Sequence, residues 1–172
     1  VMRCAGRLRE ADAFGLMAFA GEPAIVLPLG PPPRAERLGR ALEGIEPHGP
    51  TELEAALERA LAILAPSAAQ VRHAILVSDG EVTEEQAQRI RASDLSRRMA
   101  RAGVTLSALL TGDDPGAAAL LKDLAGASFH LVEDPANLPA VFLDELRKAT
   151  YGDLLRQGVA AVRAVGAPEV AR

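Results

Sequence analysis

Short apolar runs of strand length alternate along this chain with longer segments of helical periodicity. The strand-like runs cover residues 13–19, 24–29, 73–78, 104–110 and 128–132. The helical segments cover residues 34–45, 51–64 and 84–102, and two more follow Asp114 and Asp134. Strands that alternate with helices across short loops build parallel sheets covered by helices. The pattern therefore predicts an α/β fold, with a Rossmann-like, three-layer arrangement around a mostly parallel sheet.

The first two runs predict the one antiparallel part of that sheet. Only a turn containing Gly21 and Pro23 separates them, so they are expected to form a hairpin. Pro28 lies in the second run and cannot donate a backbone hydrogen bond. The second strand of the hairpin is therefore expected at an edge of the sheet.

Two of the predicted helices begin with the same pair of residues. Asp114 precedes Pro115, and Asp134 precedes Pro135. Aspartate is a favoured N-cap and proline suits the first helical position. After Asp134 the apolar residues keep helical spacing, and Glu145 is the only polar residue on that stripe.

Composition is that of one globular domain. The chain has 172 residues, of which 49% are hydrophobic and 24% charged, enough to bury a core. We assign residues 1–150 to the domain and residues 151–172 to a last helix or a linker. No run approaches the roughly 18 apolar residues that span a bilayer, and the first residues have no signal-peptide pattern.

Several function classes find no support in the sequence. The net charge of −4 gives no electrostatic basis for binding nucleic acid. Cys4 is the only cysteine, which excludes an internal disulfide and argues against a cysteine metal site. No glycine-rich phosphate-binding motif occurs, and no small-molecule substrate is evident.

Two oxygen-bearing side chains are expected at the sheet edge where α/β proteins bind ligands. Asp79 directly follows the strand 73–78, and Thr51 opens the helix 51–64. Ligands of open α/β sheets bind beyond the carboxyl ends of the strands. A carboxylate and a hydroxyl suit a hard divalent cation such as Mg²⁺.

Both residues also have a purely structural interpretation. Thr51 and Glu54 have the spacing of a capping box, in which the threonine hydroxyl binds a backbone N–H of the first helical turn. Asp79 and Gly80 form a common turn dipeptide. Spacing alone favours the capping role for Thr51, and for Asp79 it leaves the two interpretations equally supported.

Other candidate residues favour structural roles. Ser78 lacks the nucleophile elbow of serine hydrolases and is expected to form hydrogen bonds at the strand end. Asp113 and Asp114 precede a proline, which indicates a helix cap rather than a catalytic pair. The three histidines, His48, His73 and His130, are too scattered in sequence to form a metal-binding pair on one helix.

These segments resemble the von Willebrand factor type A (vWA) domain. The matching stretches are "DAFGLMAFAGEPAIVLPL", "PHGPTELEAALERAL" and "RHAILVSDGEV", and the resemblance covers about residues 5 to 150. Together with "DPANLPAVFLDEL" they resemble bacterial, membrane-anchored members of the family.

The resemblance implies a protein-binding module with a metal-ion-dependent adhesion site. In the family that site usually holds Mg²⁺, and an acidic side chain of the partner completes the metal coordination. Thr51 and Asp79 match two of the family's three metal-binding loops. The residues expected at the rim, around the partner, are His48, Gly49, Ser78, Gly80 and Glu81.

The sequence departs from the family at the third loop. The family's Asp-x-Ser-x-Ser motif follows its first strand, which lies mid-sheet, and here that position would fall between the strands 13–19 and 73–78. No such motif occurs in this sequence; "ASDLS" at 92–96 is in the wrong place. We therefore expect an N-terminally truncated domain with an incomplete metal site and poor Mg²⁺ affinity.

Three functions remain open at this point. The first is a protein-binding module of adhesion or scaffold type, which is not an enzyme. The second is a metal-assisted hydrolase that uses Asp79, although no base or nucleophile is recognisable beside it. The third is a structural domain of a larger envelope protein, in which the metal site is vestigial.

Overall fold

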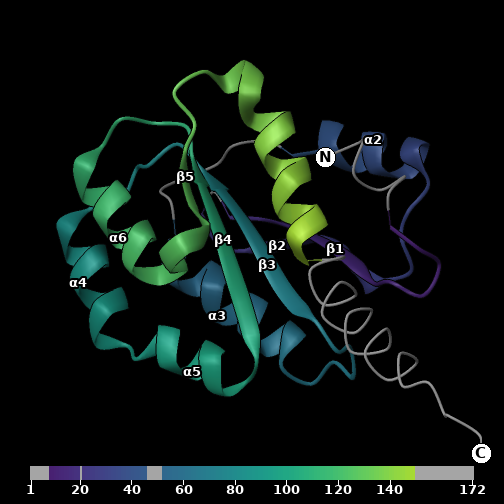
Figure 1. Ribbon diagram of the computed structural model, residues 1–172, viewed down its shortest axis with the longest axis horizontal. Coiled ribbons are helices and arrows are strands. Elements are labelled where there is room, and N and C mark those ends of the chain that lie inside the picture. The colour runs from purple at the N-terminus through teal and green to yellow at the C-terminus, as the bar shows by residue number, and fades with distance from the viewer. Residues whose placement is uncertain (1–7, 20, 46–51, 150–172) are drawn as a thin grey trace, which may run out of the picture.

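The computed structural model describes residues 8–19, 21–45 and 52–149 as a set of strands with helices around them (Figure 1). The strands are β1 (Phe14–Ala18), β2 (Ala24–Gly30), β3 (Arg72–Ser78), β4 (Val104–Leu110) and β5 (Phe129–Leu131). The helices are α2 (Ala35–Glu43), α3 (Leu53–Leu64), α4 (Glu84–Ala92), α5 (Leu95–Arg101) and α6 (Pro115–Ala125). Short 3₁₀ turns cover Gly126–Ser128 and Pro135–Asn137, and residues 138–149 are helical.

The strands form two sheets. Three parallel strands pair in the order β3-β4-β5, and β3 matches β4 along all of its length, from Arg72 opposite Val104 to Ser78 opposite Leu110. The second sheet is the antiparallel hairpin of β1 and β2. The predicted α/β class, the parallel sheet and the antiparallel hairpin are confirmed. Among the described residues β2 pairs only with β1, so Pro28 lies on an edge strand as expected.

The main core lies on one face of β4. Side chains alternate across a strand, so Leu106, Ala108 and Leu110 face the same way. These residues are nearly or fully buried and pack with apolar residues of α3, α4, α5 and α6. The helix 138–149 covers the opposite face of the sheet (Figure 1). The sheet is therefore covered on both faces, as the predicted three layers require.

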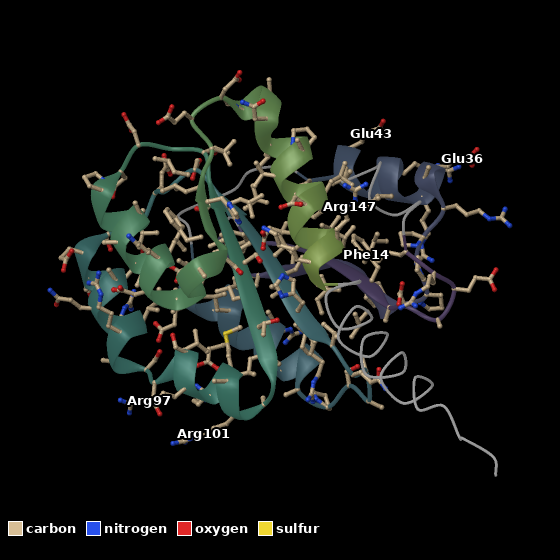
Figure 2. All side chains as sticks on the ribbon, in the orientation of Figure 1. Phe14, Glu36, Glu43, Arg97, Arg101 and Arg147 are labelled. Carbon is tan, nitrogen blue, oxygen red and sulfur yellow. The ribbon has the colours of Figure 1, made fainter. Side chains whose placement is uncertain are left out.

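A second, smaller core joins β2 to α2. Leu27 and Leu38 are buried there and contact Phe14, Leu16 and Leu42. The outer faces of the helices carry charged side chains, such as Glu36 and Glu43 of α2 and Arg97 and Arg101 of α5 (Figure 2).

The predicted single helix over 84–102 was wrong. The structure has two helices, because Asp94 takes a left-handed conformation with φ 55° and ends the regular helix between α4 and α5. Asparagine and aspartate adopt this conformation more readily than other non-glycine residues. The hydroxyl of Ser93 donates to the carbonyl of Ile90 at 2.8 Å, which satisfies one carbonyl at the end of α4.

The helix starts were predicted with mixed success. Asp114 accepts a hydrogen bond from the amide of Ala117 at 2.7 Å, and Asp134 accepts one from Ala136 at 2.9 Å, so both predicted caps are confirmed. Helix α3, in contrast, begins at Leu53 with Glu52 as its N-cap and has no side-chain cap. The capping box predicted for Thr51 and Glu54 involves a residue outside the described ones and stays a prediction.

Candidate functional site

Asp79 lies where the sequence placed it, at the carboxyl end of β3. Because β3, β4 and β5 are parallel, the loops that follow them lie at one edge of the sheet. We call this edge the Asp79 rim; it comprises Ser78–Glu81, Thr111–Asp114 and Val132–Asp134. The loops are joined by backbone hydrogen bonds, from Thr111 N–H to Ser78 O at 2.9 Å and from Val132 N–H to Leu110 O at 2.7 Å.

Two glycines fix the backbone around Asp79. Gly80 has φ 97°, a conformation that costs glycine little. A side-chain Cβ at Gly112 would lie 1.7 Å from the carbonyl oxygen of Asp79, so only glycine lets the two loops approach this closely. The Asp79 backbone is therefore held between β3 and the loop after β4.

The side chains of Ser78 and Asp79 differ in burial. The hydroxyl of Ser78 is buried and accepts a hydrogen bond from the amide of Gly80 at 3.2 Å. The Asp79 side chain is exposed, and its Oδ1 lies 3.5 Å from the amide of Glu81 in a loose turn. The expected strand-end role of Ser78 is confirmed, and the Asp79 carboxylate faces solvent.

The rest of the predicted site lies outside the described residues. That holds for Thr51, His48 and Gly49, so the structure does not test whether they approach Asp79. Within the described part of the chain, no group of three or more acidic, histidine or cysteine side chains could hold a metal ion. Mg²⁺ requires several oxygen ligands, so the described residues around Asp79 do not by themselves form a metal site.

A buried polar cluster beneath the helix 138–149 was missed by sequence reasoning. Glu145 is 2% exposed, and one of its carboxylate oxygens accepts a hydrogen bond from Ser107 of β4. Its other oxygen accepts from His130 Nε2 at 2.9 Å and from Lys148 Nζ at 2.7 Å. His73 of β3 joins through its Nε2, 3.0 Å from the Ser107 hydroxyl. The cluster connects three strands to the helix.

The hydrogen-bond directions assign the protons in this cluster. The Ser107 hydroxyl has one proton, which it donates to Glu145, so His73 Nε2–H must donate to Ser107. In neutral His73 the Nδ1 atom then faces the Thr105 hydroxyl, 2.7 Å away, whose single proton is shared with the Arg72 carbonyl oxygen at 3.3 Å. Burial lowers the pKa of His73 and outweighs the opposing effect of the Glu145 charge, which favours this neutral form.

The Glu145 carboxylate is kept ionised by its neighbours. Burial alone raises its pKa, but hydrogen bonds from Lys148, Ser107 and His130 together lower it below the ordinary value. Ser107 is completely buried, so no substrate can reach its hydroxyl. The serine, histidine and glutamate therefore form a structural network rather than a hydrolytic site.

Two features of the sequence could have revealed this cluster. Glu145 is the only polar residue on the apolar stripe of its helix, and a carboxylate placed there must find partners. His73, Ser107 and His130 lie on three strands whose parallel pairing brings them together. The distance along the sequence therefore did not keep His73 and His130 out of one cluster.

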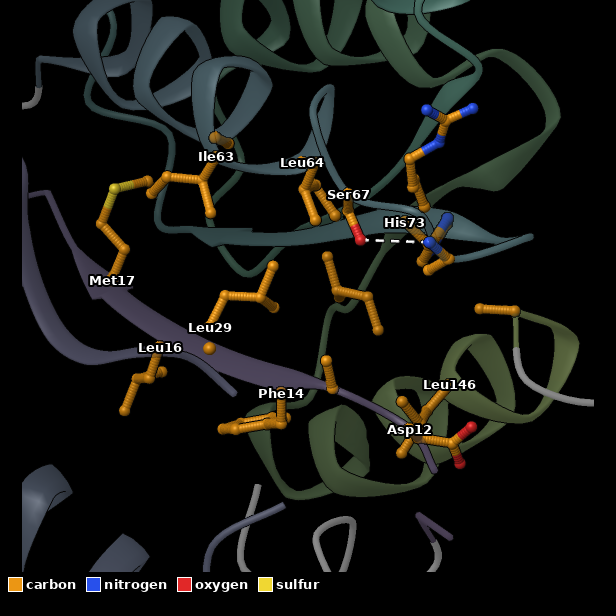
Figure 3. Close-up of a pocket in the computed structure, with 18 of the residues that line it drawn as sticks. Asp12, Phe14, Leu16, Met17, Leu29, Ile63, Leu64, Ser67, His73 and Leu146 are labelled. Carbon is orange, nitrogen blue, oxygen red and sulfur yellow. Dashed lines mark hydrogen bonds between the residues drawn. The ribbon is translucent and has the colours of Figure 1, made fainter. Parts of the chain in front are cut away.

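A large groove separates the two sheets. It has a volume of about 1100 Å³ and is lined by residues of β1, β2 and β3. Figure 3 shows β1 and β3 on its sides, with Ile63 and Leu64 of α3 at one face and Leu146 of the helix 138–149 at the other. In the part of the chain that the structure describes, β1 and β3 do not pair with each other. The groove lies where the sequence comparison with vWA domains expected a central strand.

Comparison with known proteins identifies the architecture. A sequence model of the von Willebrand factor type A domain matches residues 1–81. A search of curated protein sequences found no match. The structure is similar to a von Willebrand factor type A protein from Catenulispora acidiphila, with a TM-score of 0.68 and 18% identity over 86% of this chain. The chain spans 36% of that protein.

Two proteins of Bacteroides are also similar in structure. BatB from Bacteroides thetaiotaomicron has a TM-score of 0.63 and 19% identity, and the alignment covers 86% of this chain and 83% of that one. An aerotolerance-related membrane protein from Bacteroides fragilis has a TM-score of 0.59 and 18% identity, with 86% and 85% covered. The sequence model of the von Willebrand factor type A domain thus matches the first 81 residues, and the described residues have the fold of these structures.

Proposed function

We propose that this chain is a protein-binding module and that the Asp79 rim is its binding surface. Domains of the vWA type generally mediate interactions between proteins. The observation that carries the proposal is the exposed Asp79 carboxylate at the carboxyl end of a parallel sheet, on a backbone fixed by Gly80 and Gly112. A rigid rim of this kind presents its side chains with little loss of entropy on binding.

The partner is proposed to contribute an acidic side chain, with Mg²⁺ between it and the rim. Asp79 and Thr51 are the residues that would hold the ion, which would offset the repulsion between two carboxylates. Because the described residues contain no group of three or more acidic, histidine or cysteine side chains that could hold a metal ion, the proposed affinity for Mg²⁺ is low. The flanking residues His48, Gly49, Ser78, Gly80 and Glu81 would surround the partner's side chain.

A binding role is favoured over an enzymatic one. Ser78 is hydrogen-bonded to the amide of Gly80, and the Ser107 hydroxyl is completely buried. The described residues contain no group of three or more acidic, histidine or cysteine side chains that could hold the metal ion of a metal-assisted hydrolase. These observations support the proposal that the chain has no catalytic activity.

The parent protein is proposed to be membrane-associated. The support is the structural similarity to an aerotolerance-related membrane protein from Bacteroides fragilis. None of the described helices is both long and apolar enough to cross a bilayer, so an anchor is not among them.

A calorimetric titration with Mg²⁺ and Mn²⁺ tests the metal-dependent part of the proposal. We expect weak binding to the wild type, no binding to Asp79→Ala, and unchanged binding to Asp123→Ala. Asp123 is a matched control, because it is an exposed aspartate on α6 whose only described ion pair is to Arg91 at 3.6 Å. An identical titration curve for wild type and Asp79→Ala would show that Asp79 does not bind the ion.

A second measurement tests the binding surface. A glutamate-containing peptide, added with Mg²⁺ to the isotope-labelled chain, should shift the amide resonances of Ser78–Glu81 and Thr111–Asp113. The same peptide should leave them in place in Asp79→Ala. Shifts confined to other parts of the molecule would contradict a binding surface at this rim.

A further inference from the structure

Charge is distributed unevenly between the two ends of the parallel sheet. The loops and helix starts on the side of the Asp79 rim contain ten acidic residues and no lysine or arginine, in the ranges 52–54, 79–85, 113–114 and 133–134. Within residues 52–149 the basic residues lie elsewhere. They are on α5, in the second halves of the other helices, or at the start of β3 (Arg59, Arg72, Arg89, Arg91, Arg97, Arg98, Arg101, Lys122, Arg147 and Lys148).

This polarity follows from local preferences that the fold aligns. Acidic side chains stabilise the first turn of a helix and basic side chains the last turn, because of the helix dipole. Helix α4 shows both, with Glu84 and Glu85 in its first turn and Arg89 and Arg91 in its last. Helices that lead into or out of parallel strands run antiparallel to them, so they begin on the side of the rim. The preferences of single helices therefore add up to one polarity of the whole sheet.

α5 occupies the end of the sheet opposite to the Asp79 rim (Figure 1). We call this end the base face; it comprises α5 and the loop 66–71. Leu95 and Met99 turn into the main core, and the arginines of α5 lie on its outer side. Arg97 and Arg101 point away from the molecule (Figure 2), and the side chain of Arg97 is 78% exposed. The base face therefore presents cations to solvent.

The loop 66–71 adds an uncharged, partly apolar surface to the base face. Its sequence is PSAAQV, and Val71 is 39% exposed, which makes it one of three exposed large apolar residues in the described chain. The next residue, Arg72, fixes the loop beside the end of α5. Its Nη1 donates to the carbonyl oxygen of Ala65 at 3.1 Å, and its Nη2 lies so close to Gly103 that a Cβ there would be 2.8 Å away. Arginines and an exposed valine therefore share one face.

The acidic rim does not cancel the charge of the base face. β3 runs from one end of the sheet to the other with seven residues, a length of about 23 Å. The Debye length at physiological ionic strength is about 8 Å, so charges at the two ends are largely screened from each other. The base face therefore acts locally as a cationic surface, although the net charge of the chain is −4.

We propose that the base face docks onto an anionic lipid bilayer, with its arginines on the headgroup phosphates and Val71 between headgroups and acyl chains. Guanidinium groups bind phosphate well, and each basic residue near an anionic bilayer adds to the affinity. The proposed membrane association of the parent protein brings such a surface within reach. The proposal goes beyond the binding role of the Asp79 rim, which the docked chain would turn away from the membrane.

A second copy of the chain fits the base face less well. The rim of another copy would offer acidic side chains to the arginines. Its exposed residues Asp79, Glu81 and Asp113 are charged, however, so they do not match Val71. A bilayer matches both features, because its phosphates lie above an apolar layer. A contact of base face on rim would also not close, and would continue from copy to copy as a filament.

Cosedimentation of the full 172-residue chain with lipid vesicles tests the proposal. One set of vesicles is phosphatidylcholine alone, and the other contains about one-third phosphatidylglycerol, which is anionic. We expect binding to the anionic vesicles to be at least tenfold tighter. The difference should disappear at about 1 M salt, where the Debye length is about 3 Å.

Two pairs of arginine replacements locate the docking face. The double variant Arg97→Gln/Arg101→Gln should bind the anionic vesicles at least tenfold more weakly than the wild type. The matched control is Arg37→Gln/Arg40→Gln, because these exposed arginines belong to α2, far from α5 in Figure 1. The control removes the same charge and should bind as the wild type does. Circular dichroism checks that both variants are folded.

A tryptophan probe reports the orientation of the bound chain. The sequence has no tryptophan, so Val71→Trp introduces a single one on the base face. Its emission should shift to the blue with anionic vesicles, because the indole ring enters the membrane interface. The control is Leu131→Trp, at the carboxyl end of β5 and 49% exposed, whose emission should stay unchanged.

Several outcomes would each overturn the proposal. Equal binding to both kinds of vesicle, or binding to neither, would exclude docking by charge. Undiminished binding of Arg97→Gln/Arg101→Gln would assign the binding to other residues, and a blue shift of Leu131→Trp alone would assign it to another face. A salt-sensitive oligomer in sedimentation velocity, without vesicle binding, would assign the base face to a second copy. Asp79→Ala should bind vesicles as the wild type does, so failure here is distinguishable from failure of the proposed function at the Asp79 rim.

Discussion

At the scale of one residue, Glu145 shows how hydrogen bonds offset the desolvation cost of a buried charge. A carboxylate taken out of water costs several kcal/mol unless it is paired and hydrogen-bonded. This one is 2% exposed and accepts hydrogen bonds from Ser107, His130 and Lys148. Removal of the Glu145 carboxylate would leave these three hydrogen-bond donors without this acceptor. The helix 138–149 therefore depends on Glu145 for its position on the sheet.

Replacement of Glu145 should reduce stability in a pH-dependent way. Because its folded-state pKa lies below the unfolded value, the stabilisation is complete above the unfolded pKa of about 4.3 and is lost as pH falls through the lower folded pKa. We expect Glu145→Gln to lower the free energy of unfolding by about 1–3 kcal/mol at pH 7, and by less at pH 3. Urea denaturation at several pH values measures both.

Asp144→Asn is the matched control for this prediction. Asp144 also contacts Lys148, at 2.9 Å, but is 60% exposed, so its replacement should change stability little at any pH. A constant difference between wild type and Glu145→Gln from pH 7 to pH 3 would show that the charge of Glu145 contributes nothing to the pH dependence.

Single residues were predictable from sequence where their role is local. Asp114 and Asp134 cap the helices that follow them, because a cap depends only on the next two or three residues. The partners of Glu145 lie on β4, β5 and one turn further along the helix, and His73 joins from β3. Local sequence does not specify such contacts, although the polar residue on an apolar stripe indicated that they must exist.

At the scale of elements, the strands were the most predictable part of the chain. β3 and β4 are short apolar runs, β4 mostly buried and β3 mostly half-buried, and their sequence has no competing periodicity. The break between α4 and α5 was overlooked, although the apolar spacing indicated it. Ile90 and Met99 are both buried, and nine residues separate them, which would place them on opposite faces of one continuous helix.

Asp94 provides a test of that break. In a continuous helix, Asp94→Ala would stabilise the protein, since alanine is the best helix former. In the structure Asp94 has φ 55°, which costs a residue with a Cβ roughly 1–2 kcal/mol more than glycine. We therefore expect Asp94→Ala to destabilise the domain by about 1 kcal/mol and Asp94→Gly to match or exceed the wild type, as measured by chemical denaturation. A stabilising Asp94→Ala would contradict the break.

At the scale of the molecule, the two sheets divide the domain into unequal parts. The larger part has the parallel sheet and the main core; the smaller part has the hairpin, α2 and the core of Leu27 and Leu38. Sequence periodicity predicted the elements of both parts but not the groove between them, because a groove is a property of how sheets are placed. The expectation of a missing central strand came from the vWA resemblance alone.

This division predicts that the smaller part opens before the rest of the domain unfolds. Opening free energies within one protein range from near zero to the global value, and segments with few buried contacts open first. The hairpin rests on two buried leucines and borders the groove, whereas β4 is buried between the main core and the helix 138–149. Native-state hydrogen exchange should therefore give lower opening free energies for β1 and β2 than for β4.

Two leucine-to-alanine variants, one in each core, show in that experiment whether the two cores open independently. Leu38 and Leu120 are both completely buried, so the same change, leucine to alanine, should cost each core about 2–5 kcal/mol. Leu38→Ala should reduce protection in β1 and β2 and leave β4 unchanged, because the smaller part is already open when β4 exchanges. Leu120→Ala should reduce protection in β4. If Leu38→Ala lowered the protection of β4 by the same amount as that of β1, the two sheets would unfold as one cooperative unit, and the groove would be no boundary between them.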